Sequence, residues 1–173
     1  MAGYGSIVGG WNNLGLAQKS LIVGRDNIAA ANADDSVVSG YNNQLLASRS
    51  IIGGVDNIID TEANYSIVVG EKNQLSNYRS AIFGSNNISI ALDTDDPGTG
   101  RGLIAGHDNK NTGDFNIVAG RSNIISGSYN AVFGGYHTST GHSVSGKYET
   151  IGGARHVVKG NGNAVFGAFN TVQ

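Results

Sequence analysis

Short apolar segments with alternating positions recur along the whole chain and are separated by polar turns. The series opens with SIVGGWNN, SLIVGRDN and SVVSGYNN and ends with NAVFGAFN. Each segment carries one glycine at the same place, and Val or Ile stands two residues before it in every repeat. β-Branched residues predict short strands, and the Gly and Asn residues between them predict tight turns. The pattern therefore predicts a repeat protein built from strands.

The spacing of the repeats predicts the architecture. The index glycines are Gly10, Gly24, Gly40, Gly54, Gly70, Gly84, Gly106, Gly120, Gly134, Gly153 and Gly167. Most intervals are 14 or 16 residues, too few for a helical hairpin but enough for two strands of about five residues and two turns. Each repeat is then one coil that pairs in parallel with the next at roughly 4.8 Å. We expect an all-β parallel β-solenoid of about eleven coils, forming a single domain over residues 1–173.

Two polar columns accompany the apolar one. Ser stands four residues before the glycine in the first half of the chain, as in Ser20 and Ser50, and Asn takes that place in much of the second half. Asn also stands three residues after the glycine in most repeats, as in Asn27 and Asn57. Asn side chains in the same slot of successive coils can stack their amides, so we expect an Asn ladder.

The first strand of each coil is apolar on both faces. The unvarying Val or Ile points into the coil. The residues on either side of it point outward and are also apolar, and where one of them is large the other is small, as in Ala81 with Phe83 or Ile51 with Gly53. A strand that is apolar on both faces is buried on both, so a second layer must cover the outer one. We expect a homo-oligomer whose interface includes Ile7, Leu21, Ile51, Phe83, Leu103, Ile117, Phe133 and Phe166.

Composition narrows the function classes. Gly makes up 27 of the 173 residues, but a hydrophobic content of 39% and a formal net charge of -2 argue against disorder. The scattered Lys and Arg argue against nucleic acid as a partner. The absence of Cys excludes a disulfide framework and a thiolate metal site. The chain shows no signal-peptide pattern and no apolar run long enough to span a membrane, so no membrane insertion is expected.

The S-x-x-x-G segments and the Asn-bearing turns, at 14-residue spacing, resemble the YadA-like head repeat of trimeric autotransporter adhesins and related bacteriophage tail-fibre repeats. The resemblance covers roughly residues 6–173 and implies a left-handed β-roll, a homotrimer, and attachment to a surface receptor or glycan. The family's usual core is S-V-A-I-G, with Ala where this chain has Val or Ile. No ligand-contact residue carries over, because the motif is structural.

Two insertions, residues 91–102 and 139–148, interrupt the repeat and are candidate binding loops. The candidate contact residues are Asp93, Asp95, Asp96, Arg101, His142, Lys147 and Tyr148. The three aspartates could hold Ca²⁺, although their spacing matches no known calcium loop and acidic loops are often simply solvated. Apart from that possibility, no cofactor is expected.

The remaining candidates are weaker. His137 and His156 occupy the Asn slot and could meet as metal ligands, but His also tolerates a left-handed turn, so no metal site is predicted. Outward aromatic residues such as Trp11 and Tyr65 could bind glycans or protein, although scattered exposed aromatics are normal. No nucleophile, base and orienting acid recur together, which indicates that the protein is not an enzyme.

The leading functional hypothesis is a non-enzymatic trimeric fibre or adhesin module that attaches to a host or surface. It would be extracellular, on a bacterial surface or a virion. The alternative is a subunit that stacks head-to-tail into a filament, since the given chain shows no polar cap at either end. A polysaccharide-cleaving tail spike is a weaker alternative. An ice-binding solenoid is weaker still, because no regular Thr column is present.

Overall fold

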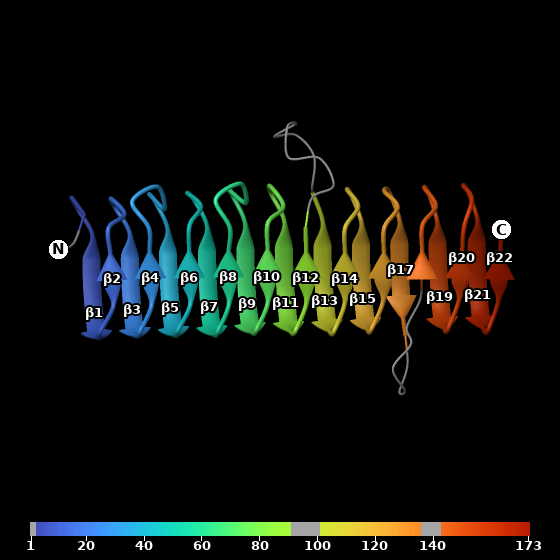
Figure 1. The fold of residues 1–173 in the computed structure, drawn as a ribbon, viewed down its shortest axis with the longest axis horizontal. Helices are drawn as coiled ribbons and strands as arrows, with labels where there is room; N and C mark the ends of the chain where they lie inside the picture. The colour runs from blue at the N-terminus through green and yellow to red at the C-terminus, as the bar shows by residue number, and fades with distance from the viewer. Residues whose placement is uncertain (1–2, 91–100, 136–142) are drawn as a thin grey trace.

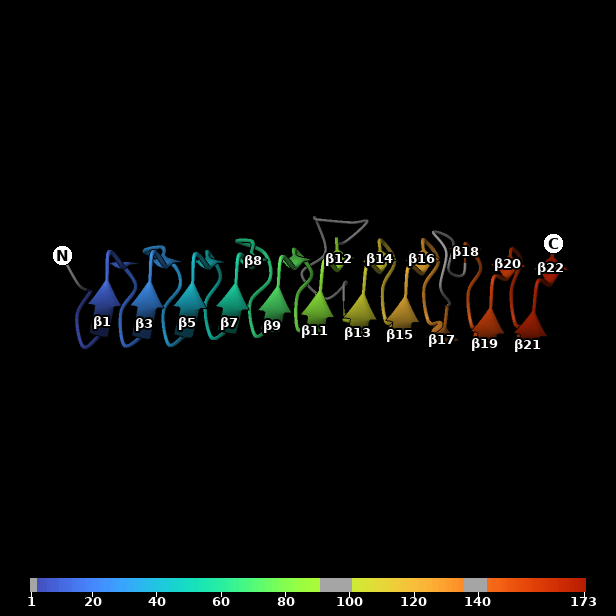
Figure 2. The same ribbon diagram turned by 90° about the horizontal axis from the view of Figure 1, so that it is seen from below.

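The protein is a β-solenoid in which every coil supplies one strand to each of two parallel sheets. The computed structural model describes residues 3–90, 101–135 and 143–173, and these ranges contain no helix. Both sheets have eleven strands that pair in chain order, so the coils stack into a rod with the two termini at opposite ends (Figures 1 and 2). The predicted all-β parallel solenoid of eleven coils is confirmed.

The two sheets, here called sheet A and sheet B, differ in strand length. Sheet A consists of β1 (Ile7–Trp11), β3 (Leu21–Arg25), β5 (Val37–Tyr41), β7 (Ile51–Val55), β9 (Ile67–Glu71), β11 (Ala81–Ser85), β13 (Leu103–His107), β15 (Ile117–Arg121), β17 (Ala131–Gly134), β19 (Thr150–Ala154) and β21 (Ala164–Ala168). Sheet B consists of β2 (Leu14–Gly15), β4 (Ile28–Ala29), β6 (Gln44–Leu45), β8 (Ile58–Ile59), β10 (Gln74–Leu75), β12 (Ile88–Ser89), β14 (Lys110–Asn111), β16 (Ile124–Ile125), β18 (Ser143–Val144), β20 (Val157–Val158) and β22 (Thr171–Val172).

The prediction of about five residues for the second strand of each coil was wrong, because strands of sheet B have two. The cause is the turn on either side. Asn12 precedes β2 at φ 54° and Lys19 follows it at φ 50°, and most other coils repeat these two left-handed positions. Such residues bend the chain and cannot continue an extended ladder, so only the two residues after the ladder Asn pair as a strand.

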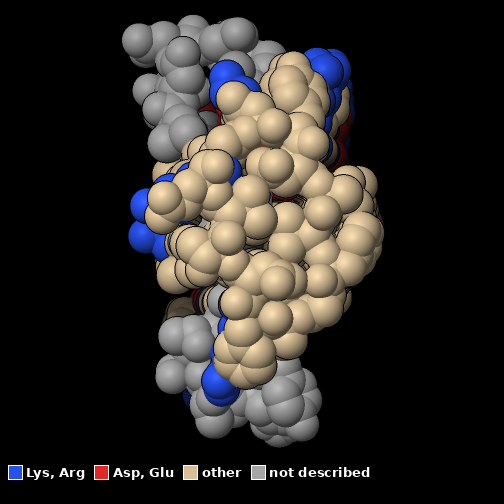
Figure 3. Space-filling view, turned by 90° about the vertical axis from the view of Figure 1, so that its right-hand side faces the viewer, with Lys and Arg blue, Asp and Glu red and all other residues tan. Residues whose placement is uncertain are grey.

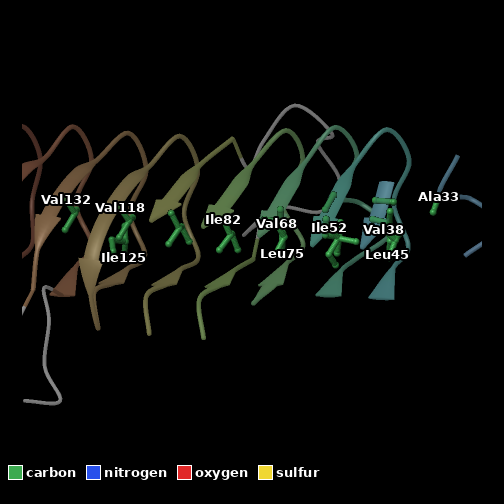
Figure 4. Close-up of a cluster of buried hydrophobic side chains, with 14 of the residues drawn as sticks. Ala33, Val38, Leu45, Ile52, Val68, Leu75, Ile82, Val118, Ile125 and Val132 are labelled. Atoms are coloured by element: carbon green, nitrogen blue, oxygen red, sulfur yellow. The ribbon is translucent and has the colours of Figure 1, made fainter. Parts of the chain in front are cut away.

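The core is a narrow row of apolar side chains that runs between the two sheets along the rod (Figure 4). Residues two before each index glycine point inward and are buried from Ile22 to Val165, as predicted. They face the second residue of each sheet B strand, such as Leu45 or Ile125, and a column of small residues, such as Ala47. In the first coil the sheet B position is Gly15, and a Cβ there would lie 2.8 Å from Val8 Cγ2 and 3.0 Å from Ile22 Cδ1, so these two side chains occupy the space that a larger residue fills in other coils.

The predicted Asn ladder is present and runs through the buried turn after sheet A. Asn57 shows the arrangement: its Nδ2 donates to Asn43 Oδ1 at 3.0 Å and to the carbonyl oxygen of Gly70 at 2.7 Å. Its Oδ1 accepts from the backbone nitrogen and Nδ2 of Asn73 at 3.0 and 2.9 Å. The ladder Asn residues do not take the left-handed conformation; the residues just before them, such as Asp56 at φ 56°, do. The Asn side chains therefore serve as hydrogen-bonding rungs rather than as turn formers.

A second ladder closes the other turn. Each Ser hydroxyl accepts from the backbone nitrogen of the next coil, as Ser36 Oγ does from Ser50 at 3.0 Å. Asn116 and Asn130 continue the ladder, and Glu149 follows them, with its Oε2 accepting from the backbone nitrogen of Asn163 at 2.7 Å. Buried polar groups need such partners, so the two ladders let a narrow solenoid bury its turns.

The index glycines make the turn after sheet A possible. Gly54 has φ +109°, and a Cβ built on it would lie 1.9 Å from the carbonyl oxygen of Gly70 in the next coil. No other residue type fits that contact, which explains why Gly recurs at this position in every repeat.

The insertions differ in part from their predicted bounds. Residues 91–100 and 136–142 lie outside the described residues. Gly102 is regular: its nitrogen donates to Ser80 Oγ at 3.0 Å in the Ser ladder. Ser143–Val144 form β18 and pair with β16 and β20, so the prediction of an insertion at 139–148 was wrong for residues 143–148, which belong to a coil. The weak repeat signal there hid the strand.

Polar residues enter the core in the central coils. Asn111 replaces an apolar residue of sheet B, and its Oδ1 accepts from Asn116 Nδ2 at 2.7 Å. Asn77 stands in the column of small residues and is 0% exposed, yet neither Nδ2 nor Oδ1 has a hydrogen-bond partner. An unpaired buried amide destabilises the folded state, so Asn77 marks the weakest point of the core.

Candidate functional site

The outer side of sheet A carries an uncharged surface along the first part of its strands, whereas the fifth strand residue is charged in several coils, as in Arg25, Glu71 and Arg121. The uncharged surface is formed by the residues three and one before each index glycine, because side chains alternate along a strand. The first column is Ile7, Leu21, Val37, Ile51, Ile67, Ala81, Leu103, Ile117, Ala131, Thr150 and Ala164. The second column is Gly9, Val23, Ser39, Gly53, Val69, Phe83, Ala105, Ala119, Phe133, Gly152 and Phe166. We call these two columns the sheet A face.

All eight residues predicted to form an oligomer interface lie on the sheet A face. Each is exposed in the single chain, and Ile117, for example, is 46% exposed. Parallel pairing places equivalent residues side by side, as Ile117 with Leu103. The sequence therefore identified one continuous surface, and the structure brings its residues together. The outer side of sheet B is different, since it mixes apolar residues such as Ile124 with polar and charged ones such as Gln74 and Lys110.

Part of the difference in side-chain size on the sheet A face is compensated by neighbouring residues of the same chain. Gly152 is paired with Phe133 on one side and with Phe166 on the other. A Cβ on Gly152 would lie 3.0 Å from Phe166 Cδ1, so the Phe166 ring occupies the space above the glycine. The columns thus form a fairly level surface at this point although their residues differ in volume.

The turn that leads into sheet A carries a second feature. In most coils the residue five positions before the index glycine has a left-handed conformation, and we call these residues the turn column. It contains Lys19, Asp35, Arg49, Tyr65, Arg79, Phe115, Tyr129 and Tyr148, with φ between 49° and 61°. In its middle, the Tyr65 ring lies between two arginines. Arg49 and Arg79 lie over the Tyr65 ring at 5.3 and 5.5 Å from its centroid, within the range of a cation–π contact.

Further along the turn column, three rings stack directly. Phe115 and Tyr129 have centroids 4.8 Å apart and planes at 4°, and Tyr129 and Tyr148 are 5.1 Å apart at 18°. Arg101 covers the other side of Phe115 at 5.5 Å. The stack borders an open groove of about 380 Å³ that reaches the sheet A face. The groove is lined by Phe115, Ile117, Tyr129, Asn130, Ala131, Tyr148, Glu149 and Thr150.

The residues predicted to contact a ligand have different outcomes. Asp93, Asp95, Asp96 and His142 lie outside the described residues, as does the proposed Ca²⁺ loop. Arg101, Lys147 and Tyr148 are described, and Arg101 and Tyr148 belong to one aromatic stack rather than to two separate loops. Sequence reasoning missed this stack. The signal was available, because aromatic and Arg residues recur five residues before successive index glycines.

The described residues contain no group of three or more His, Asp or Glu side chains placed to hold a metal ion. His137 is outside them, so its predicted proximity to His156 stays a prediction. His156 is 0% exposed and replaces Asn in the ladder: its Nδ1 accepts from the backbone nitrogen of Asn170 at 3.1 Å. It lies within 3.2 Å of the Gly152 carbonyl oxygen through Nε2. Arg155, not His156, takes the left-handed conformation, so His is here as a rung of the ladder.

Ionic interactions in the described part of the chain lie on the surface. The Glu71 carboxylate, 2.9 Å from Lys72 Nζ, raises the pKa of that lysine above its ordinary value, but both side chains are more than half exposed. Among the described residues, no helix is long and apolar enough to cross a bilayer. The sheet A face and the turn column offer apolar and aromatic contact.

Comparison with known proteins gives one match. Residues 97–173 match the model of a family described as the grass antifreeze beta roll. The matched segment is less than half of the chain and includes the last five coils. No curated protein and no solved structure matches the chain. The comparisons show no YadA-like head family, and the resemblance to that repeat stays a prediction.

Proposed function

We propose that the protein is a non-catalytic attachment fibre module in which three copies bury their sheet A faces around a common axis. The observation that carries the proposal is the sheet A face itself, where no charged residue occurs in either column over eleven coils. Soluble monomers seldom expose so long an apolar surface. The number of three copies comes from the resemblance, not from the geometry. Attachment would place the fibre outside the cell or on a virion.

The dimensions of the face limit how much surface the association can bury. Eleven coils at about 4.8 Å extend for roughly 50 Å, and four strand residues across give a width of about 13 Å. The strip therefore offers on the order of 650 Å² per chain, which a trimer divides between two neighbouring copies, so each pairwise contact is smaller than the ~800 Å² per partner of a standard interface. Chains with the same straight face can lie along one another without bending.

Light scattering on a matched pair of variants tests this proposal. Ile117 and Ile124 belong to the same coil and are 46% and 55% exposed, but Ile117 lies on the sheet A face and Ile124 on the outer side of sheet B. Ile117→Lys should shift the mass from trimer towards monomer, because three buried charges would meet near the axis. Ile124→Lys should leave the trimer intact. A wild-type monomer at micromolar concentration would refute the proposal.

Ice binding is the second candidate, favoured by the match of residues 97–173 to the grass antifreeze beta roll. A flat rod with a fixed coil spacing is a suitable frame for recognising a lattice. The sheet A face is less suitable, since its second column varies from Gly152 to Phe166 and a lattice repeats without such variation. Thermal hysteresis in a monomeric wild-type sample would establish this candidate in place of the first, and its absence at millimolar protein would exclude it.

A further inference from the structure

The aromatic stack in the turn column has one open end. Stacking proceeds from coil to coil, so each ring presents its two faces along the long axis of the rod. Phe115 is covered by Arg101 and Tyr129, and Tyr129 by Phe115 and Tyr148. Tyr148 is covered by Tyr129 on one side only, and it is 64% exposed.

The next coil places Gly162 where the stack would continue. The backbone nitrogen of Tyr148 donates to the carbonyl oxygen of Ser128, and that of Gly162 donates to the carbonyl oxygen of Lys147 in the same way, at 3.3 and 3.0 Å. A Cβ built on Gly162 would meet no atom within 4 Å. The second face of the Tyr148 ring therefore looks onto an open slot, which we call the Tyr148 slot.

Cationic side chains outnumber acidic ones at this end of the chain. From residue 115 onward, Arg121, Lys147, Arg155 and Lys159 are the cationic Lys and Arg residues, and Glu149 is the single acidic residue. Glu149 is only 1% exposed, and its two carboxylate oxygens accept from Asn163. Figure 3 shows this end of the rod with Lys and Arg side chains projecting at several places and little acidic surface. Lys147 is adjacent to Tyr148 in sequence, and Asn161 Oδ1 binds its backbone nitrogen at 3.0 Å.

We propose that the Tyr148 slot binds one sugar ring of an acidic saccharide. The C–H face of a pyranose packs on the exposed tyrosine ring, which has an apolar body and a polar hydroxyl. Its carboxylate is then attracted to Lys147 and Lys159, and its hydroxyl groups reach the exposed side chain of Asn161. A cationic ligand would also cover an aromatic face, but the adjacent Lys147 repels it.

A saccharide also fits better than a nucleic acid. Single-stranded nucleic acid needs a continuous basic groove with successive stacking platforms, whereas here one ring face is open and the cations are few. This site would supply the ligand contact of the proposed attachment function, and the inference rests on that function. The slot opens along the rod axis rather than across the sheet A face, so association of the chains does not by itself cover it.

Isothermal titration of the full chain tests the site with trigalacturonic acid, its neutral galactose trisaccharide counterpart and a short oligothymidylate. We expect measurable binding of the acidic trisaccharide that weakens as salt rises. Gly162→Tyr should reduce it at least about tenfold by covering the Tyr148 ring, and Tyr148→Ala should do the same by removing it. Tyr residues already occupy this left-handed position in other coils, so Gly162→Tyr is compatible with the backbone.

Tyr65→Ala is the matched control, because both faces of that ring are covered by arginine in the same column. It should bind the acidic trisaccharide as the wild type does. Failure of the wild type to bind at millimolar concentration, equal binding of the neutral trisaccharide, tighter binding of the oligothymidylate, or unchanged binding by both slot variants would each overturn the proposal. Light scattering on the same variants should show the unaltered trimer, which separates loss of the ligand site from failure of self-association.

Discussion

Two buried asparagines should respond to the same substitution with opposite signs. Asn57 and Asn77 are both 0% exposed and both lie in the first half of the solenoid. Asn57 is a rung of the Asn ladder with five side-chain hydrogen bonds at 3.1 Å or less, whereas neither polar atom of the Asn77 side chain has a partner. Replacing each with Ala removes the same atoms from two buried sites, one with hydrogen-bond partners and one without.

The magnitudes follow from counting these contacts. Each hydrogen bond contributes about 1 kcal/mol net, so Asn57→Ala should lower the free energy of unfolding by about 4–5 kcal/mol. The loss has a second source, because the Gly70 carbonyl oxygen and the Asn73 backbone nitrogen lose a buried partner. Asn77→Ala removes an unpaired amide from a column that is Ala or Gly in most other coils. It should raise the free energy of unfolding by about 1–3 kcal/mol.

Urea unfolding followed by far-ultraviolet circular dichroism measures both effects. The three proteins must be compared at one chain concentration, since association would stabilise each of them. Equal destabilisation by the two substitutions would refute the reasoning, because it would show that filling volume rather than hydrogen bonding determines the stability of the solenoid. A loss below about 1 kcal/mol for Asn57→Ala would refute the ladder as a major stabilising element.

Two further pairs of substitutions separate backbone geometry from side-chain chemistry. Gly54→Ala should leave little folded protein in size-exclusion chromatography, because its Cβ would lie 1.9 Å from the Gly70 carbonyl oxygen, whereas Gly162→Ala should fold, since nothing lies within 4 Å. Folded Gly54→Ala would contradict the close approach of the coils. His156→Ala should lower the free energy of unfolding by about 2 kcal/mol through loss of its contacts to Asn170 and a carbonyl oxygen. His156→Asn should retain most of the stability, and an equal loss in both variants would contradict the role of His156 as a rung.

The repeat made much of the fold predictable. A Val or Ile two residues before each index glycine fixed the inward column, and the recurring Asn fixed the ladder, because both depend on spacing within one coil. Strand lengths in sheet B were not predictable in this way. They depend on which turn residues become left-handed, and Asn12, Lys19 and Arg49 share no side-chain property that announces it.

The candidate sites also differ in whether they depend on one coil or on several. The eight residues of the predicted interface were found because alternation within a single strand places them outward. The stack of Phe115, Tyr129 and Tyr148 spans three coils, and the interval between the second and third ring is 19 residues rather than 14. Their common place five residues before the index glycines is readable in the sequence, but the register of β15, β17 and β19 shows that the rings meet.

The sequence by itself determined the coil: its length, its inward apolar column, its Asn ladder and an apolar outer face on sheet A. These features are local, since each depends on a few residues and on the alternation of side chains along a strand. The tertiary structure decided which side chains of neighbouring coils are in contact. Examples are the Phe166 ring over Gly152, the unpaired amide of Asn77 and the open face of Tyr148. Stacking at a fixed coil spacing creates these contacts, and the register that sets them exists only once the coils have paired.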